Sequence, residues 1–207
     1  VFAVYTFTLL AALLYLGPLS DHVGRRPVVA AGSLALALSV AMFWFAGSLA
    51  ALLVARALQG LAAGLLIPAL SAMMIDFESP SHRNIAALWN TIGPMIGLGA
   101  GALGAALLLD LTSEPTTAVF GSLVLAFLIV ATVVWSTPEL APKTQIRRGD
   151  LRPRFTVPPH LRRMFTAGVP VIIAGWATNG LFLALGADLV GSCLLYTSPS
   201  PRDKRQS

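Results

Sequence analysis

Six long stretches of this chain carry almost no charge, and this feature limits the possible folds more than any other. The stretches are Val1–Leu19, Val28–Ala46, Leu49–Ile75, Ile85–Leu109, Ala118–Ser136 and Met164–Val190. Each is close to or above the length of about 20 apolar residues that a helix needs to cross the hydrocarbon core of a bilayer. Spanning segments of this kind are helical, because unpaired backbone groups are costly in lipid. We therefore expect an all-α membrane protein with six transmembrane helices.

The composition excludes an ordinary soluble domain. Hydrophobic residues make up 56% of the 207 positions and charged residues only 11%, about half the usual charged share of a soluble protein. A chain this small cannot bury so much apolar surface in one core. The single cysteine, Cys193, also excludes a disulfide framework and a cysteine-based metal site.

Both ends of the sequence predict that the chain is a fragment. Val1 already lies in an apolar run, so we expect at least one more helix before it. After Gly191 the apolar pattern stops, and the run from Cys193 to Asp203 resembles the translation of a transposase-type sequencing adaptor. We therefore expect residues 192–207 to be a non-native tail. The alternative is a native Pro/Ser-rich segment that forms no core.

Basic residues outside this tail occur in alternate loops between the six stretches. Ten of these basic residues lie in three of the loops, and loops 47–48 and 110–117 have none. The remaining one, Arg56, lies inside a stretch. The positive-inside rule places the basic loops in the cytoplasm. Three of the 14 basic residues lie in the tail, so the net charge gives no reason to expect a nucleic-acid partner.

The longest basic loop, residues 137–163, has the composition of a linker. It contains seven basic residues, two acidic residues and five prolines. Such a segment cannot bury a core, so we expect a cytoplasmic linker that is mostly extended or loosely helical. Contact with anionic lipid head groups, at about 1 kcal/mol per basic residue, is a second interpretation that can coexist with the first.

The loop between the first two stretches has a specific set of small and charged residues. Gly17 permits a close approach between helices, and Asp21 can accept hydrogen bonds from free N–H groups at a helix start. Gly24 permits a turn with positive φ. Arg25 and Arg26 should lie at head-group level. Any short cytoplasmic hairpin could carry such residues singly, but their combined spacing is more specific.

This spacing resembles the signature loop of the major facilitator superfamily, G-x-x-x-D-[RK]-x-G-[RK]-[RK]. Residues 17–26 match it except at His22, where the family usually has Arg or Lys. The resemblance implies that the six stretches are helices two to seven of twelve. Pro138-Glu139 then matches a Pro-Glu pair that many relatives carry after the sixth helix. It also implies that the Asp21 loop is a conformational latch against the opposite half of the protein, and not a substrate site.

Arg56 is a charge well inside the third stretch. Burying it costs about 2.5–3.5 kcal/mol on insertion scales, so it needs a partner or a water-filled cavity. We expect the partner in a missing helix, in the substrate or in the cavity; the alternative is snorkelling of the side chain to the outer surface. The run from Arg56 through Gln59 to Gly60 resembles the R-x-x-Q-G motif of the superfamily's fourth helix, which implies a role in coupling or translocation.

The fourth stretch carries glycines at every fourth position. Gly93, Gly97 and Gly101 share one helix face, which permits close packing, and Pro94 allows a bend. Generic small-residue packing explains this pattern equally well. The Gly93-Pro94 pair resembles part of the superfamily's antiporter motif, although Trp89 and Leu98 replace glycines of that motif.

Three further groups could line a cavity, namely Asn90, Trp176 and Asn179, although packing hydrogen bonds explain them as well. The spans contain no cluster with metal-ligand spacing and no nucleophile with a base and an orienting group. We therefore expect no cofactor, no metal and no enzyme activity.

The resemblance implies a major facilitator-type bundle fragment with four parts. These are an N-terminal transmembrane bundle at 1–136 that lacks its first helix, the linker 137–163, the first helix of the C-terminal bundle at 164–191, and the tail 192–207. The full protein would be a multi-pass protein of a bacterial plasma membrane. Its partners would be a small-molecule substrate, protons, membrane lipid and the missing C-terminal half of its own chain.

The implied function is secondary active transport by alternating access. We favour proton-coupled export of drug-like molecules or metabolites, as by an antiporter, because of Arg56 with Gln59 and the partial Gly93-Pro94 motif. A sugar or organic-anion symporter of the same superfamily is the first alternative. A receptor or structural membrane protein without transport activity is a more distant one.

Overall fold

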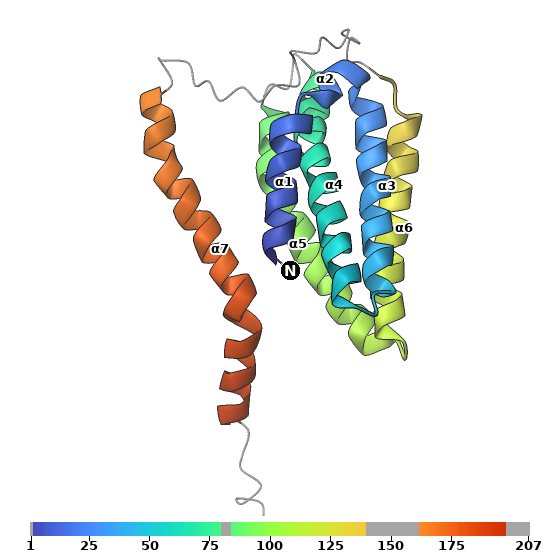
Figure 1. Cartoon of the computed structure of the whole chain (residues 1–207), viewed down its shortest axis with the longest axis vertical. Helices are drawn as coiled ribbons and strands as arrows, with labels where there is room; N and C mark the ends of the chain where they lie inside the picture. Colours follow the sequence, from blue (N-terminus) through green and yellow to red (C-terminus); the bar gives the residue numbers. More distant parts are fainter. Residues whose placement is uncertain (1, 80–83, 140–161, 198–207) are drawn as a thin grey trace, which may run out of the picture. The chain divides into compact units, whose positions relative to one another are not determined.

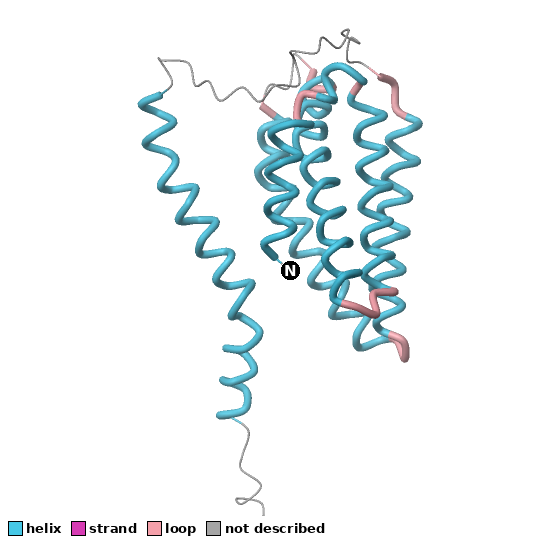
Figure 2. Tube along the Cα trace, viewed as in Figure 1, coloured by secondary structure: helices cyan, strands magenta, loops and turns pink. Residues whose placement is uncertain are grey.

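A computed structural model of the chain describes residues 2–79, 84–139 and 162–197. The regular structure in these ranges is helical throughout (Figure 2). The helices are α1 (Phe2–Leu16), α2 (Leu19–Val23), α3 (Arg25–Trp44), α4 (Leu49–Asp76), α5 (Ile85–Leu111), α6 (Pro115–Ser136) and α7 (Arg162–Thr197). The all-α fold class is confirmed.

The predicted apolar stretches correspond to the six long helices, with one difference at the first. We expected a continuous span from Val1 to Leu19, but α1 ends at Leu16 and α2 starts at Leu19. Gly17-Pro18 separates them because proline lacks a backbone N–H and disfavours helical geometry in the residue before it. Helices α3, α4, α5 and α6 are each long and apolar enough to cross a membrane, and Ala3–Leu16 forms a shorter apolar helix.

Helix α4 is the centre of the bundle. It packs against α1 on one side and α3 on another, and α6 packs along α3 (Figure 1). Helix α5 contacts α6 and, more sparsely, α4. Most side chains of α5 are therefore exposed in this chain, including the apolar Leu103, Leu107 and Leu111.

Small residues set the two tight interfaces of α4. A Cβ at Gly64 would lie 2.5 Å from the Cβ of Ala12 on α1. The backbone of α1 can therefore approach α4 closely only because residue 64 is glycine. On the α3 side, a Cβ at Gly32 would lie 2.7 Å from Leu66 Cγ. The buried core of Val28, Val29, Leu66 and Ala69 continues this α3–α4 interface. Close packing of small residues holds α4 in place where apolar side chains alone gain little in lipid.

A buried hydrogen bond also joins α3 and α4. The hydroxyl of Ser39, which is fully buried, donates to the backbone carbonyl of Ala55 at 2.9 Å. Hydroxyl bonds of this kind contribute to helix association in membranes.

Helix α7 belongs to a second compact unit. Residues 1–153 form the first unit and residues 154–207 the second. The α7 helix contains Pro170 and continues past Gly191 to Thr197, so the change of composition at Gly191 does not end it. The predicted linker falls mostly outside the described residues, and the domain boundaries stay a prediction.

Candidate functional site

The loop from Gly17 to Arg26 is built around the short helix α2. Gly24 separates α2 from α3 with φ of 110° and ψ of 148°, a backbone conformation that only glycine adopts without strain. A Cβ at Gly24 would also lie 2.7 Å from Glu139 Oε2. The turn therefore needs glycine for two independent reasons, and this part of the sequence interpretation agrees with the structure.

Arg25 connects this loop to the end of α4. Its guanidinium forms an ion pair at 2.9 Å with Asp21 of α2, four residues earlier in the sequence. Its Nε also pairs with the carboxylate of Asp76, the last residue of α4. The Arg25 side chain is only 18% exposed, whereas that of Asp21 is 59% exposed. Arg25 is thus the centre of the group, and Asp21 remains accessible to a further partner.

Glu139, just after α6, binds the backbone at the start of α3. Its two carboxylate oxygens accept from the N–H of Arg25 at 3.3 Å and of Arg26 at 3.0 Å. The first N–H groups of a helix have no partner within the helix, and an anion there is stabilised by the helix dipole. We call Asp21, Arg25, Asp76 and Glu139 the charged cluster. It ties α2, α3, α4 and the end of α6 together at one end of the bundle.

Arg26 points to a different neighbour. Its guanidinium carbon lies 4.9 Å from the centre of the Trp135 ring on α6. Its Nε is buried and has no hydrogen-bond partner among the described residues. The Nδ1 of His22 lies 2.9 Å from the carbonyl oxygen of Pro18. The two arginines of the motif therefore have different contacts: Arg25 bridges carboxylates and Arg26 packs on an aromatic ring.

Sequence reasoning missed Asp76 as a member of the cluster and noted Glu139 only as part of a Pro-Glu pair. A signal existed for both. Each is an acidic residue next to the end of an apolar stretch, on the same side of the membrane as the Arg25 loop by the charge pattern. The pattern does not say which of the acidic residues meet an arginine.

Arg56 lies in the second turn of α4, near the end opposite to Asp76. One of its terminal nitrogens donates to Gln59 Oε1 at 2.7 Å, and its guanidinium carbon lies 4.7 Å from the centre of the Phe43 ring on α3. We expected a partner outside the visible helices, and the structure supplies these two uncharged contacts within them. Cation–π contacts are worth about 0.5–2 kcal/mol, depending on desolvation.

Gly60 lies against α1. A Cβ there would clash with the Thr8 hydroxyl and the Tyr5 carbonyl of α1. This glycine therefore has an evident packing function between α1 and α4, apart from any role in translocation.

The glycine face of α5, formed by Gly93, Gly97 and Gly101, does not contact the other described helices of its own unit. A Cβ at Gly93, Gly97 or Gly101 would meet nothing within 4 Å in the described structure. Pro94 lies inside α5 and does not end it. The other helices of the same unit thus do not pack on this face, and the expected close contact stays a prediction.

The three candidate cavity residues are divided between the two units. Asn90 on α5 accepts a hydrogen bond from the Ser71 hydroxyl on α4 at 3.0 Å. Trp176 is 73% exposed on α7, which belongs to the other unit. The side chain of Asn179 lies outside the described residues. A cavity role for these residues stays a prediction.

Comparison with known proteins identifies the family. The sequence model of the Major Facilitator Superfamily matches residues 1–200, nearly the whole chain. The chain belongs to the major facilitator superfamily. This match includes the start of the segment that we expected to be a non-native tail. Together with the long apolar helices, it identifies a multi-pass membrane protein.

Three superfamily relatives share shorter segments with the chain. The multidrug efflux pump LfrA of Mycolicibacterium smegmatis is 35% identical over 103 residues, which cover 45% of this chain and 20% of LfrA. The multidrug resistance protein MdtM of Escherichia coli is 51% identical over 45 residues, 22% of the chain and 11% of MdtM. The multidrug transporter mfsB of Aspergillus fumigatus is 42% identical over 60 residues, 29% of the chain and 10% of mfsB. The matched segments thus span at most a fifth of these superfamily members.

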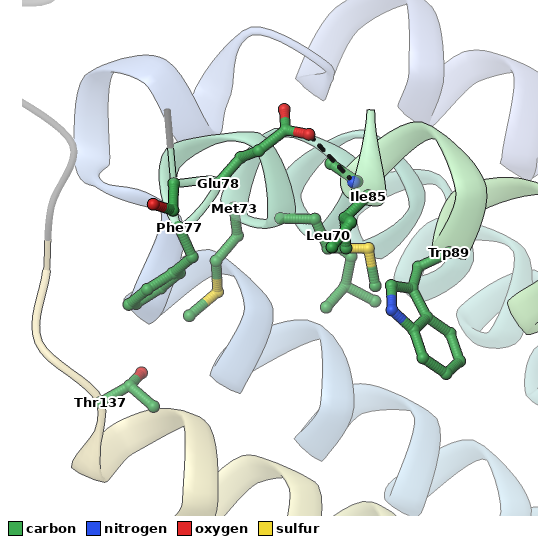
Figure 3. Close-up of a pocket in the computed structure, with 10 residues that line it drawn as sticks. Leu70, Met73, Phe77, Glu78, Ile85, Trp89 and Thr137 are labelled. Carbon is green, nitrogen blue, oxygen red and sulfur yellow. Dashed lines mark hydrogen bonds between the residues drawn. The ribbon is translucent and has the colours of Figure 1, made fainter. Parts of the chain in front are cut away.

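The chain also has a cavity of about 660 Å³ between the end of α4 and the start of α5 (Figure 3). Its lining includes Phe77, the residue after Asp76 of the charged cluster. Met73, Phe77 and Glu78 line it from the end of α4, and Ile85 and Trp89 from the start of α5. Thr137, beside Glu139, completes the lining on the α6 side. None of these residues was a sequence candidate for a site.

Proposed function

We propose that the chain is part of a secondary transporter that moves a small solute across a membrane by alternating access. Within that mechanism, we propose export of drug-like or metabolite molecules in exchange for protons. Superfamily membership supports the first statement. The second rests on the multidrug names of the three relatives and on the contacts of Arg56.

The charged cluster is the observation that carries the proposal. Arg25 and Glu139 join four helix ends through interactions that can be made and broken without unfolding a helix. A set of contacts that differs between two arrangements of a bundle biases the equilibrium between them. Asp21, more than half exposed, leaves room for a contact with the rest of the protein in one arrangement. A receptor without alternating access has no need for such a device.

The membrane orientation follows from the basic loops. We propose that the end with the charged cluster faces the cytoplasm, because all of the basic loops lie on that side. Arg56, near the other end of α4, then lies toward the outer half of the membrane. Gln59 and Phe43 contact its guanidinium. We propose that this fixed positive charge acts in proton coupling or on substrate charge.

Transport by the full-length protein in proteoliposomes tests the proposal. We expect uptake of a lipophilic dye into inverted vesicles that depends on an imposed proton gradient, acidic inside. A symporter would instead take up a sugar or an organic anion when the gradient is reversed, acidic outside, because its solute and proton move in the same direction. With an organic anion, Arg56 would balance the substrate charge. No solute movement above protein-free liposomes, with any of these substrates, would contradict transport altogether.

A further inference from the structure

The cavity at the ends of α4 and α5 has the lining of a ligand site. At about 660 Å³ it falls within the range of small-molecule pockets, which are mostly apolar with a few polar groups that fix orientation. Its lining is mainly hydrocarbon, aromatic rings and thioether sulfur. Glu78 is the charged side chain among the ten residues that line it.

Aromatic rings flank the cavity. Figure 3 shows Phe77 and Trp89 on opposite sides, with Leu70 and Met73 between them. Trp89 is 50% exposed and Phe77 47% exposed, so both have free surface for a ligand. Aromatic faces attract organic cations, and methionine adapts to the shape of an apolar guest.

Glu78 supplies a negative charge at the rim. In the part of the chain that the structure describes, its side chain makes one long hydrogen bond of 3.5 Å, which Oε1 accepts from the Ala86 N–H at the start of α5. Among the described residues it has no ion pair, whereas Asp76, two positions earlier, is paired with Arg25. A carboxylate beside an apolar cavity favours a cation and disfavours an anion there.

We propose that this cavity binds a lipophilic organic monocation, with the apolar body between Phe77 and Trp89 and the charge toward Glu78. The cavity lies at the end of the bundle that holds the charged cluster, at the depth where tryptophan commonly meets the membrane surface. Amphiphilic cations concentrate at this depth. The site is separate from the mid-membrane path proposed for transport, and binding there does not require transport.

Binding of tetraphenylphosphonium to the full-length protein in nanodiscs, without a proton gradient, tests the inference. We expect a photoreactive azido derivative to label residues between 70 and 89, located by mass spectrometry. Glu78→Gln keeps an oxygen that can accept from Ala86 and should therefore preserve the fold. We expect this variant to weaken binding at least threefold. Trp89→Ala, at a half-exposed position, should weaken it at least threefold as well.

The matched control is Glu114→Gln, which removes a carboxylate before α6 that makes no side-chain cap bond. Its affinity should equal that of the unchanged protein. Triphenylphosphine oxide, a neutral analogue, should not compete with the cation. Absence of labelling at residues 70–89, a change below threefold in either Glu78→Gln or Trp89→Ala, or equal competition by the neutral analogue would each overturn the inference. Because binding is measured without transport, these outcomes are independent of those for the proposed function.

Discussion

The carboxylate of Glu139 accepts a hydrogen bond of 3.0 Å from the backbone N–H of Arg26, across 113 residues of sequence. The start of helix α3 is thereby bound by an anion from the segment just after α6. The Arg26 side chain also stabilises this junction between α3 and α6, because its guanidinium lies over the ring of Trp135 near the end of α6. The beginning of the predicted linker is thus attached to the signature loop through both backbone and side-chain contacts.

Replacing Glu139 by alanine should lower the stability of this junction. Two helix N–H groups lose their acceptor, and a charge-assisted hydrogen bond contributes about 1.5–3 kcal/mol when it is shielded from water. Because Glu139 is only partly buried, we expect a decrease of about 1–2 kcal/mol in the free energy of unfolding. Denaturant titration of the full-length protein in detergent micelles measures this. Glu114→Ala, before α6, is the control and should change little.

Gly24→Ala should be more damaging than the small size of the change suggests. The backbone at Gly24, with φ of 110°, costs a residue with a Cβ about 1–3 kcal/mol, and that Cβ would also push against Glu139. We expect a lower midpoint of thermal unfolding and reduced expression in the membrane. Gly47→Ala is the matched control, because a Cβ at Gly47 meets nothing within 4 Å. Equal behaviour of the two variants would mean that the α2–α3 turn tolerates other geometries.

The helices could be predicted from the sequence because length and apolarity alone decide whether a segment spans a membrane. The sequence interpretation assigned Asp21 to the free N–H groups at a helix start, whereas in the structure Asp21 pairs with the Arg25 side chain and Glu139 accepts from the N–H groups at the start of α3. The contacts of Arg25 with Asp76 and Glu139 join residues 51 and 114 positions apart. Such pairs are decided by how helices pack, and no local pattern contains that information.

Glycine positions show the same limit. The four-residue spacing of Gly93, Gly97 and Gly101 predicts a face suited to close packing, yet no described helix of the same unit packs there. For Gly60 the motif implies a role in coupling or translocation, which stays a prediction, and the structure adds a close approach of α1. A glycine pattern indicates that a helix face permits close approach and does not identify the partner helix. The cavity beside Trp89 was missed because its lining residues are ordinary apolar residues in sequence.

Arg56 should be required for transport beyond any effect on folding. Arg56→Gln removes the charge that Gln59 and Phe43 hold, whereas Arg56→Lys keeps the charge but not the planar group. We expect Arg56→Gln to lose proton-dependent transport and Arg56→Lys to retain part of it. Rates are compared in proteoliposomes at matched protein density over a range of pH. Normal transport by Arg56→Gln with an unchanged pH dependence would favour snorkelling as the account of this residue.

The segment after α6 should face the cytoplasm. Gln145 lies in the basic loop, outside the described residues, and provides a site for an introduced cysteine. In a background with Cys193 replaced, we expect an impermeant maleimide to label Gln145→Cys only after the membrane is permeabilised. A cysteine at Ser113, in the loop between α5 and α6, should be labelled in intact cells. The reverse pattern would invert the proposed topology.

Asp21→Asn should shift the balance between conformations of the transporter and leave the substrate site intact. Asp21 contacts Arg25 at the end of the bundle, whereas transporters bind solutes near the middle of the membrane. A contact made more strongly in one state changes the equilibrium by its differential free energy alone. One charge-assisted contact is worth about 1.5–3 kcal/mol, and about 1.4 kcal/mol corresponds to a tenfold change in population. Because Asp21 is more than half exposed, we expect the lower part of this range.

Spin labels on the two halves of the full-length protein measure this redistribution as a change in the distance distribution between them. Asp76→Asn is the informative companion variant, because Asp76 pairs with the same arginine from α4. If Arg25 needs both carboxylates, both variants should change the distance distribution between the labels. Transport should become slower, while the substrate affinity of each state stays nearly constant. Unchanged distances in Asp21→Asn together with lost substrate binding would instead place Asp21 in the substrate site and end the latch interpretation.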